Sequence, residues 1–289
     1  MKRLAFIALL ALSVVLPCAA DTILVEKPAM FGTIVVTEGD DGLRTLRFAR
    51  NGARQSVVKP GDPDHLVLQY TQSAFVGLAL AEMPRRMLVV GVGGGTLPMF
   101  LRKHYPEATI DAVDIDPQVI EVARGYLGLR EDALLRAHAA DGRTFIEAVR
   151  EPYDVIFLDA FSSSEVPAHL TTREFLQAVR RALTPTGVVV GNIWDRFANR
   201  LYDSMLRTYQ DVFDEVYVLG VPAAGNKIVL ALPRPLRLVE GDLVARARRH
   251  GGERQFRLAL VDPGSAAGYA FSALREPLKD GSVLRDAQR

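Results

Sequence analysis

The chain has 289 residues, of which 49% are hydrophobic and 24% are charged. A chain of this length buries about three quarters of its unfolded surface when it folds, and its apolar content excludes a disordered protein. Its 35 Lys and Arg residues balance 34 Asp and Glu residues. Charge therefore gives no reason to expect nucleic acid or an anionic membrane as a partner.

The first 20 residues predict a secretory signal peptide. Lys2 and Arg3 give a positive start, residues 4–16 are apolar, and residues 17–20 read Pro-Cys-Ala-Ala. The apolar stretch is short for a membrane span, and small residues precede the expected cut after Ala20. We therefore expect an exported, periplasmic protein with no stable membrane insertion after cleavage. An uncleaved N-terminal anchor is the alternative.

Cleavage would also remove the single cysteine, Cys18, and leave 33 basic and 34 acidic side chains. A chain without cysteine has no disulfide and no thiolate ligand or nucleophile. The five histidines do not recur at a metal-binding spacing. We expect no bound metal.

Residues 21–64 predict a small antiparallel β-hairpin domain. Strands are expected at residues 32–37, 43–48 and 55–58, separated by Asp-Asp-Gly at 40–42 and Asn-Gly at 51–52. Both separating sequences are strong hairpin signals. Residues 65–81 then favour a helix with one apolar stripe.

Residues 65–235 predict a Rossmann-like domain with a doubly wound, mostly parallel sheet. Apolar strands are expected at residues 87–91, 109–113, 134–138, 153–158, 188–193, 216–221 and 227–232. Helices are expected between them, at residues 96–104, 117–126, 143–149, 173–183 and 198–213. A tight turn at 225–226 makes the last two strands antiparallel, and residues 236–289 are expected to form a helical tail.

The first of these strands runs into a glycine loop and then a helix. The loop reads Gly91-Val-Gly93-Gly-Gly95-Thr96, so the backbone can approach a ligand at the helix N-terminus. The dinucleotide fingerprint needs glycine where Thr96 stands. A dehydrogenase is therefore a distant alternative.

Aspartates close the next two strands. Asp114 lies 23 residues beyond Gly91, where a carboxylate can bind both ribose hydroxyls, and Asp141, followed by Gly142, could meet an adenine amine. Together with the glycine loop, these residues predict an adenosine site. The alternative is an α/β fold whose glycines and aspartates only form turns and helix caps.

The fourth strand ends at Asp159 and is followed by a polar loop that includes three serines, residues 162–164, and His169. Sheets of this kind place their chemistry at such strand ends. For the serines and His169 the plainer interpretation is a flexible loop and a surface residue.

Five segments, taken in order, resemble the spermidine synthases, the polyamine aminopropyltransferases. They read VVGVGGGTL, AVDIDPQVIEVAR, AADGRTFI, YDVIFLDAF and LTTREFLQAVRRAL, and the resemblance spans residues 32–232. It implies a β-rich N-terminal domain followed by a Rossmann-like fold of the S-adenosylmethionine-dependent methyltransferase type. It also implies transfer of an aminopropyl group from decarboxylated S-adenosylmethionine to putrescine or another small amine, with release of methylthioadenosine.

The resemblance assigns roles by position. Asp159 would be the catalytic carboxylate, while Gln55 and Tyr70 would line the polyamine groove. Asp114 would bind ribose and Ile115 would pack on adenine. The rest of the donor site would come from turns at strand ends: Gly91, Gly93, Gly95, Asp141 and Gly142.

Three departures from the family pattern put putrescine in doubt. Gly93 replaces an acid that holds the donor's amino end, Ser162 replaces a second loop acid, and Thr71-Gln72 stands for His-Glu. Each lost charge-assisted contact removes about 1.5–3 kcal/mol of binding free energy. Two further classes therefore stay open: a methyltransferase that uses intact S-adenosylmethionine, and a non-catalytic exported nucleoside-binding or interaction protein. A homodimer is open too, without an identified interface.

Overall fold

The computed structural model describes residues 21–162, 165–257 and 270–286. The expected signal peptide, residues 1–20, lies outside the described residues, so its cleavage stays a prediction. None of the helices in the described ranges has the length and apolar character needed to cross a membrane.

The N-terminal sheet, sheet A, contains four antiparallel strands in chain order. These are β1 (Thr22–Ala29), β2 (Gly32–Glu38), β3 (Arg44–Arg47) and β4 (Arg54–Val58). The three expected strands and both hairpins are confirmed, but the sequence analysis missed β1. This strand lies at the sheet edge with exposed or half-buried side chains, and its register shifts between Ile23 and Val25, so its apolar alternation is weak.

The larger sheet, sheet B, has eight strands in the order β12-β10-β11-β9-β8-β5-β6-β7. Strands β5 to β9 pair in parallel, whereas β11 joins β9, and β10 joins both β11 and β12, in antiparallel fashion. The mostly parallel doubly wound sheet is therefore confirmed. The bounds are β5 (Arg86–Val90), β6 (Thr109–Asp114), β7 (Leu135–Ala139), β8 (Tyr153–Leu158), β9 (Leu183–Trp194), β10 (Glu215–Gly220), β11 (Asn226–Leu232) and β12 (Ala270–Ala273).

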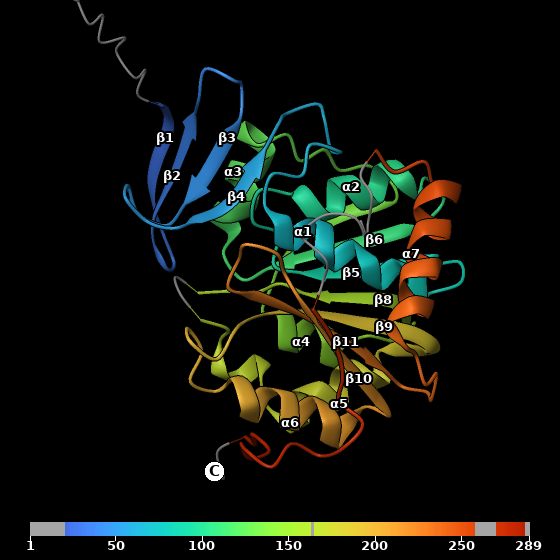
Figure 1. Cartoon of the computed structure of the whole chain (residues 1–289). Coiled ribbons are helices and arrows are strands. Elements are labelled where there is room, and N and C mark those ends of the chain that lie inside the picture. The colour runs from blue at the N-terminus through green and yellow to red at the C-terminus, as the bar shows by residue number, and fades with distance from the viewer. Residues whose placement is uncertain (1–20, 163–164, 258–269, 287–289) are drawn as a thin grey trace, which may run out of the picture.

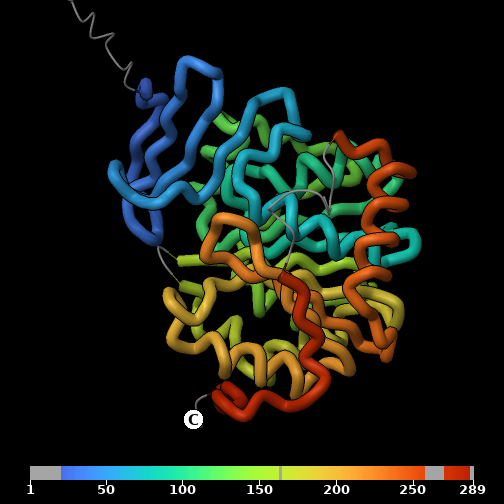
Figure 2. The backbone as a smooth tube through the Cα atoms, viewed as in Figure 1, coloured from blue at the N-terminus to red at the C-terminus, as the bar shows by residue number. Residues whose placement is uncertain are grey.

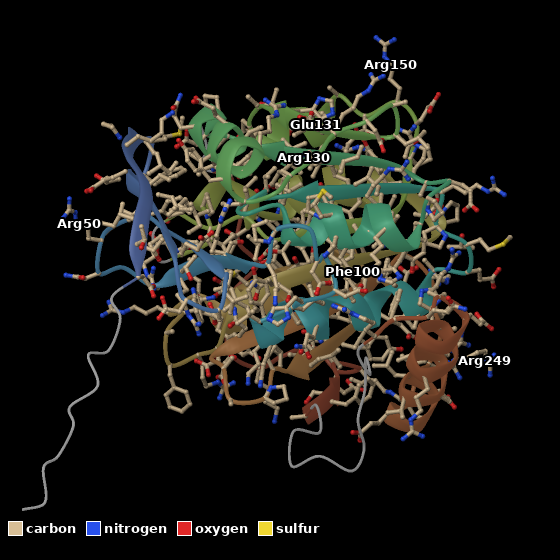
Figure 3. All side chains as sticks on the ribbon, turned by 90° about the horizontal axis from the view of Figure 1, so that it is seen from above. Arg50, Phe100, Arg130, Glu131, Arg150 and Arg249 are labelled. Atoms are coloured by element: carbon tan, nitrogen blue, oxygen red, sulfur yellow. The ribbon has the colours of Figure 1, made fainter. Side chains whose placement is uncertain are left out.

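Helices cover both faces of sheet B (Figure 1). One face carries α1 (Gln69–Ala74), the 3₁₀ helix η1 (Phe75–Leu80), α2 (Thr96–His104), α3 (Pro117–Tyr126) and α7 (Glu240–Glu253). The other face carries α4 (Gly142–Glu147), α5 (Arg173–Arg181) and α6 (Tyr202–Val212). Figure 3 shows the molecule from above, with Phe100 of α2 in the interior and Arg50, Arg150 and Arg249 extending outward from the surface.

The expected single helix over residues 65–81 is wrong in detail, because α1 is followed by the tighter η1. Gly77 of η1 lies against β9, where a Cβ would come within 2.4 Å of the Val190 Cγ2 atom. The apolar residues of this segment are buried as expected.

Of the expected helical tail, the described part is helical only in α7, and residues 258–269 and 287–289 lie outside the described residues. Residues 270–273 instead form β12, in which Phe271 stacks on Tyr217 with ring centroids 5.5 Å apart. The chain then runs past α5 and α6, where the Arg173 N–H donates to the Leu284 carbonyl at 2.7 Å. Figure 2 shows this final segment along the side of the molecule that carries α6.

Sheet A packs on α3 and faces the carboxyl ends of β5 and β6. Ile34, Val36 and Leu46 of sheet A form one apolar cluster with Val119 and Val122 of α3. Two hydrogen bonds join sheet A to the loops at these strand ends: the Met30 N–H donates to Asp116 Oδ2 at 2.7 Å, and the Gly94 N–H donates to Ser56 Oγ at 2.9 Å. The hairpin domain therefore forms one wall above the strand ends.

Candidate active site

A cavity of about 670 Å³ opens at the carboxyl ends of the parallel strands. The strand order reverses here, since β6 lies on one side of β5 and β8 on the other. Open α/β sheets bind ligands at such points. Sheet A closes one side of the cavity through residues 30–31, 48 and 53–56.

The glycine loop forms part of the cavity floor. Gly91 has a φ of +103°, and a Cβ there would lie 2.2 Å from the Asp159 carbonyl oxygen, so the turn requires glycine. Gly91 and Gly93 line the cavity as predicted. Gly95 does not; it precedes α2 in the left-handed conformation and faces a second hollow.

Asp114 lies at the end of β6 and lines the cavity beside the half-exposed Ile115. Its Oδ2 accepts the Val92 N–H and its Oδ1 accepts the Asp116 N–H, both at 3.0 Å. Burial raises the pKa of Asp114 above its ordinary value, although these amides favour the charged form. The aspartate therefore orders the glycine loop and also presents a carboxylate to the cavity.

Asp141 both caps α4 and lines the cavity, and its contact with an adenine amine stays a prediction. Its Oδ1 accepts the Thr144 N–H at 2.9 Å, and its Oδ2 lies 2.8 Å from His169 Nε2. His169 is more than a surface residue, because this contact ties the loop after β8 to the end of β7. Gly142 also lines the cavity, and a Cβ there would come within 2.5 Å of Val90 Cγ1.

Asp159 lies at the centre of a buried hydrogen-bond network. The Tyr70 hydroxyl donates to its Oδ2 at 3.1 Å, and the Asn192 side-chain amide donates to its Oδ1 at 2.8 Å. Asn226 in turn donates to Asn192 Oδ1 at 2.9 Å. Three neighbouring elements, α1, β9 and β11, thus fix the orientation of one carboxylate.

The protonation of Asp159 is unusual for a carboxylate. Burial raises its pKa to about 7, although the hydrogen bonds from Asn192 and Tyr70 favour the charged form. Burial also raises the pKa of the Tyr70 hydroxyl well above its ordinary value, with Asp159 acting in the same direction. Tyr70 therefore acts as a hydrogen-bond donor, and Asp159 can exchange a proton near neutral pH.

Gln55 reaches the cavity from a β-bulge. Leu46 of β3 pairs with Ser56, and Arg47 pairs with Arg54, so Gln55 is the extra residue on β4. Bulges re-aim side chains next to active sites. Gln55 and Tyr70, both predicted to line the substrate groove, are among the residues that line this cavity.

The residues that depart from the family pattern make local hydrogen bonds. The Thr71 hydroxyl donates to the Leu68 carbonyl at 2.6 Å, and the Gln72 side-chain amide donates to the Leu66 carbonyl at 2.7 Å. Ser162 lines the cavity, and its hydroxyl donates to the Glu165 carbonyl at 3.0 Å. None of these three groups supplies a negative charge.

Three side chains near Asp159 were missed by sequence reasoning: Asn192, Asn226 and Trp194. The first two are 6% and 7% exposed, and Trp194 packs edge-on against Phe161 with ring centroids 6.0 Å apart. A polar Asn192 inside a strand of buried apolar residues was the available signal, because a buried amide needs a hydrogen-bond partner.

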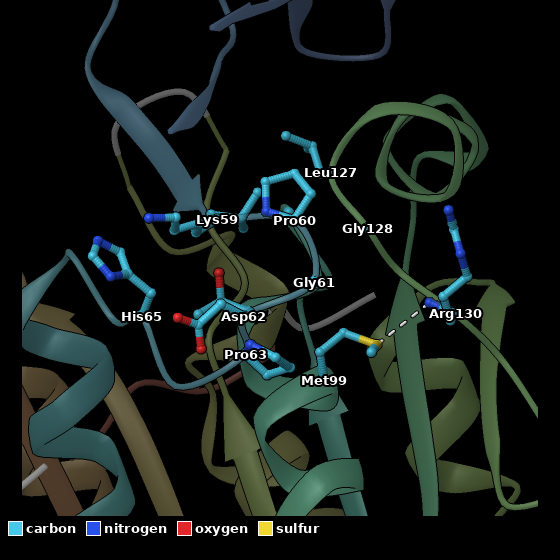
Figure 4. A pocket seen from close by; sticks show the side chains of 14 residues that line it. Lys59, Pro60, Gly61, Asp62, Pro63, His65, Met99, Leu127, Gly128 and Arg130 are labelled. Atoms are coloured by element: carbon cyan, nitrogen blue, oxygen red, sulfur yellow. Dashed lines mark hydrogen bonds between the residues drawn. The ribbon is translucent and has the colours of Figure 1, made fainter. Parts of the chain in front are cut away.

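A second, smaller hollow of about 280 Å³ lies on the other side of the glycine loop. Figure 4 shows it between residues 59–65, Met99 of α2 and the segment 127–130, with Lys59, His65 and Arg130 around it. The Arg130 N–H contacts Met99 Sδ at 3.3 Å. This hollow is separated from Asp159 by the loop itself.

The described ranges contain no group of three or more His, Cys, Asp or Glu side chains arranged to hold a metal ion.

The fold and the cavity define a Rossmann-like protein with a nucleoside-type site and a buried carboxylate beside it. The family model for the spermine/spermidine synthase domain matches residues 70–231, more than half of the chain. The chain belongs to the spermine/spermidine synthase family.

Individual relatives agree with this assignment. The polyamine aminopropyltransferase of Vibrio vulnificus is 35% identical over 218 residues, which cover 73% of this chain and 72% of that protein. A crystal structure of a probable spermidine synthase from Corynebacterium glutamicum has a TM-score of 0.76 at 20% identity, covering 92% of this chain and 97% of that one. That likeness shows the shared fold.

A methyltransferase also resembles the chain. The crystal structure of human methyltransferase-like protein 13 in complex with SAH has a TM-score of 0.60 at 30% identity. The match covers 69% of this chain and 97% of the other chain. The same fold thus occurs in a protein named for a different group transfer.

Proposed function

We propose that this protein transfers an aminopropyl group from decarboxylated S-adenosylmethionine to a primary amine and releases methylthioadenosine. The observation that carries the proposal is the buried Asp159 carboxylate, held by Tyr70 and Asn192 next to the glycine loop of a spermine/spermidine synthase family member. A fixed carboxylate beside a nucleoside site suits the deprotonation and orientation of an amine.

The proposed reaction begins with an ammonium group at Asp159. A primary amine has a pKa of about 10 and is mostly protonated in water. The Asp159 carboxylate takes the proton, and the neutral amine keeps its lone pair. That pair forms an N–C bond to the methylene next to the sulfonium sulfur. The C–S bond breaks with its electrons going to sulfur, which becomes the neutral thioether of methylthioadenosine. Asp159 then gives its proton to solvent.

The donor would occupy the end of the cavity formed by the glycine loop. Asp114 presents its carboxylate at the end of β6, where a ribose is expected, and Ile115 and Asp141 line the neighbouring wall. The backbone amides at the start of α2 lie below the same space. No metal takes part in this proposal, since the sulfonium is itself an activated leaving group.

Methyl transfer is the second candidate. Gly93 leaves the donor end without the acid that would repel a methionine carboxylate, and one structural relative is a methyltransferase bound to SAH. The same Asp159 would accept the amine proton, but the transferred group would be a methyl and the thioether product would be S-adenosylhomocysteine.

A donor competition distinguishes the two candidates. The purified chain from residue 21 onward is given both donors in equal amounts with a pool of primary amines, and the products are followed by mass spectrometry. We expect methylthioadenosine and an aminopropylated amine, both absent with Asp159→Asn. A methylated amine with S-adenosylhomocysteine would instead establish methyl transfer. Absence of both products from folded protein would contradict both candidates and favour a nucleoside-binding module.

We also propose that the protein is exported to the periplasm after cleavage following Ala20. The support is the charge and hydropathy pattern of residues 1–20. Fractionation of expressing cells, with mass spectrometry of the mature N-terminus, tests this. A periplasmic chain that starts at Asp21 is expected, and a cytoplasmic chain that starts at Met1 would contradict it.

A further inference from the structure

We propose that the acceptor is a primary amine with an uncharged apolar or aromatic tail, and that Trp194 and Phe161 bind this tail. The inference rests on the proposed function and specifies its substrate class. It follows from the charges around Asp159, the direction of two strands and the contact between two aromatic rings.

Among the described residues that line the cavity, four carry carboxylates: Asp114, Asp141, Asp159 and Glu165. Asp114 accepts the Val92 N–H of the glycine loop and the Asp116 N–H, and Asp141 contacts Thr144 and His169. Glu165 is exposed to solvent. Among the described residues, Asp159 is therefore the carboxylate held on the acceptor side, by Tyr70 and Asn192, and the reacting nitrogen needs it.

The space beyond Asp159 is neutral and aromatic. Side chains two residues apart in a strand share a face, so Trp194 lies on the same face of β9 as Asn192, one step closer to the cavity mouth. Phe161 follows Asp159 by two residues and meets Trp194 edge to face, with the ring planes at 68°. Both rings are half-buried and line the cavity.

The neighbouring polar groups are amides that already have partners. Asn192 bonds to Asp159, and Asn226 bonds to Asn192. A second ammonium in this region would lose water and would find aromatic faces but no buried carboxylate. Cation–π contact recovers part of that loss, whereas an apolar tail has no such loss and gains contact area on both rings.

Gly225 lies against the tryptophan ring. A Cβ at Gly225 would lie 3.4 Å from the Trp194 ring, in ordinary van der Waals contact, and the Asp195 N–H donates to the Gly225 carbonyl at 2.8 Å. The turn between β10 and β11 therefore supports the ring from behind and leaves its other face to the cavity.

A matched pair of acceptors tests the inference. Pentylamine and 1,5-diaminopentane have the same five-carbon chain and differ by one terminal amino group. With decarboxylated S-adenosylmethionine, we expect kcat/KM for pentylamine to exceed that for the diamine at least tenfold, with methylthioadenosine release as the readout. This comparison uses the wild-type chain and does not depend on whether a variant folds.

Variants assign the preference to the rings. Trp194→Ala is expected to lower kcat/KM for pentylamine about tenfold, mainly through KM, and to leave the diamine nearly unchanged. Trp194→Glu should raise activity with the diamine. Phe197→Ala is the matched control, because Phe197 is 95% exposed and does not line the cavity. Glu165→Gln removes the exposed carboxylate of the cavity lining, and the preference for pentylamine over the diamine should persist in this variant.

Opposite results are distinguishable. A preference for the diamine, abolished by Glu165→Gln, would overturn the inference and leave aminopropyl transfer standing. Equal activity with both acceptors, unchanged by Trp194→Ala, would also overturn it. No release with any amine, from protein that still binds methylthioadenosine, would contradict the proposed function itself.

Discussion

The two ends of the cavity are built from different kinds of structure. The donor end consists mainly of backbone, namely the glycine loop after β5, whose Val92 amide donates to Asp114 at the end of β6. The positions of these two strands therefore set its geometry. The acceptor end consists of side chains on α1, β8, β9 and β11 around Asp159. The shape of a binding site formed by backbone changes only when the fold changes. A binding site formed by side chains can accept a different ligand after a few substitutions.

Departures from the family pattern occur at both ends of the cavity. Gly93 lacks the expected acid at the donor end, Ser162 lacks the expected acid in the loop after β8, and Trp194 places an aromatic ring in the cavity that Asp159 also lines. The sheet is not disturbed by any of these. The proposed function therefore combines a nucleoside donor at the backbone-built end with a changed second substrate at the end built from side chains.

The largest expected effect lies at the acceptor end. Asp159→Asn should lower kcat by about 10²–10⁴, because the carboxylate that accepts the amine proton is lost. Binding of methylthioadenosine, measured by calorimetry, should stay within a few fold of wild type. Equal loss of turnover and of nucleoside binding would mean that Asp159 supports the whole cavity, and the division into two ends would fail.

The converse variant is at the donor end. Asp114→Ala should weaken methylthioadenosine by about 1.5–3 kcal/mol, the value of a charged hydrogen bond. Asp114→Asn, which keeps an oxygen for the Val92 or Asp116 amide, serves as the control for loop folding. Unchanged affinity in the alanine variant would remove the ribose-binding role from this residue.

An added acid would sharpen the contrast between the two donors. Gly93 has a φ of +51°, which aspartate adopts more readily than most residues, and a Cβ there would make a tight contact of 3.1 Å with the Ser56 hydroxyl. Gly93→Asp should therefore lower stability, and the folded variant should bind decarboxylated S-adenosylmethionine about tenfold more tightly, with S-adenosylmethionine weakened. Competition binding measures both affinities. Equal changes for the two donors would show that position 93 does not meet the donor's tail.

The smallest effect concerns pH. The carboxylate form of Asp159 grows as pH rises through its pKa of about 7, so kcat should rise with pH through this range. Tyr70→Phe removes a hydrogen bond that favours the charged form of Asp159 and therefore raises the pKa of this carboxyl group. The acidic limb of the kcat–pH profile should move to higher pH by about one unit. Tyr202→Phe, at a residue outside the cavity, is the control. A limb that stays in place would separate Tyr70 from the protonation of Asp159.

The sequence predicted the parts of the fold that repeat. Continuous apolar strands, the glycine loop and the Asp-Gly and Asn-Gly turns identified sheet B, the helices between its strands and three strands of sheet A. Edge strands were harder: β1 alternates weakly, and β12 is four residues long and pairs with β10 from about 50 residues away. The pairing of these edge strands depends on their partner strands, which the local pattern of apolar residues does not reveal.

The residues of the cavity were predictable from the ends of the parallel strands and, for Gln55 and Tyr70, from their positions in the family resemblance. Gly91, Gly93, Asp114, Ile115, Asp141, Gly142, Asp159, Gln55 and Tyr70 all line the cavity, as expected from strand order and from the family resemblance. The network beyond them was not predictable. Asn192 and Asn226 meet across two strands, and His169 reaches Asp141 from a loop, so only the three-dimensional register brings them together.

A sequential titration tests the contrast between the two ends most directly. Methylthioadenosine is titrated into the chain from residue 21 onward, and putrescine is then titrated into the resulting complex. We expect saturable binding of methylthioadenosine and no measurable heat from putrescine. Tight binding of putrescine would contradict a changed acceptor end, and failure of methylthioadenosine to bind folded protein would contradict a retained donor end.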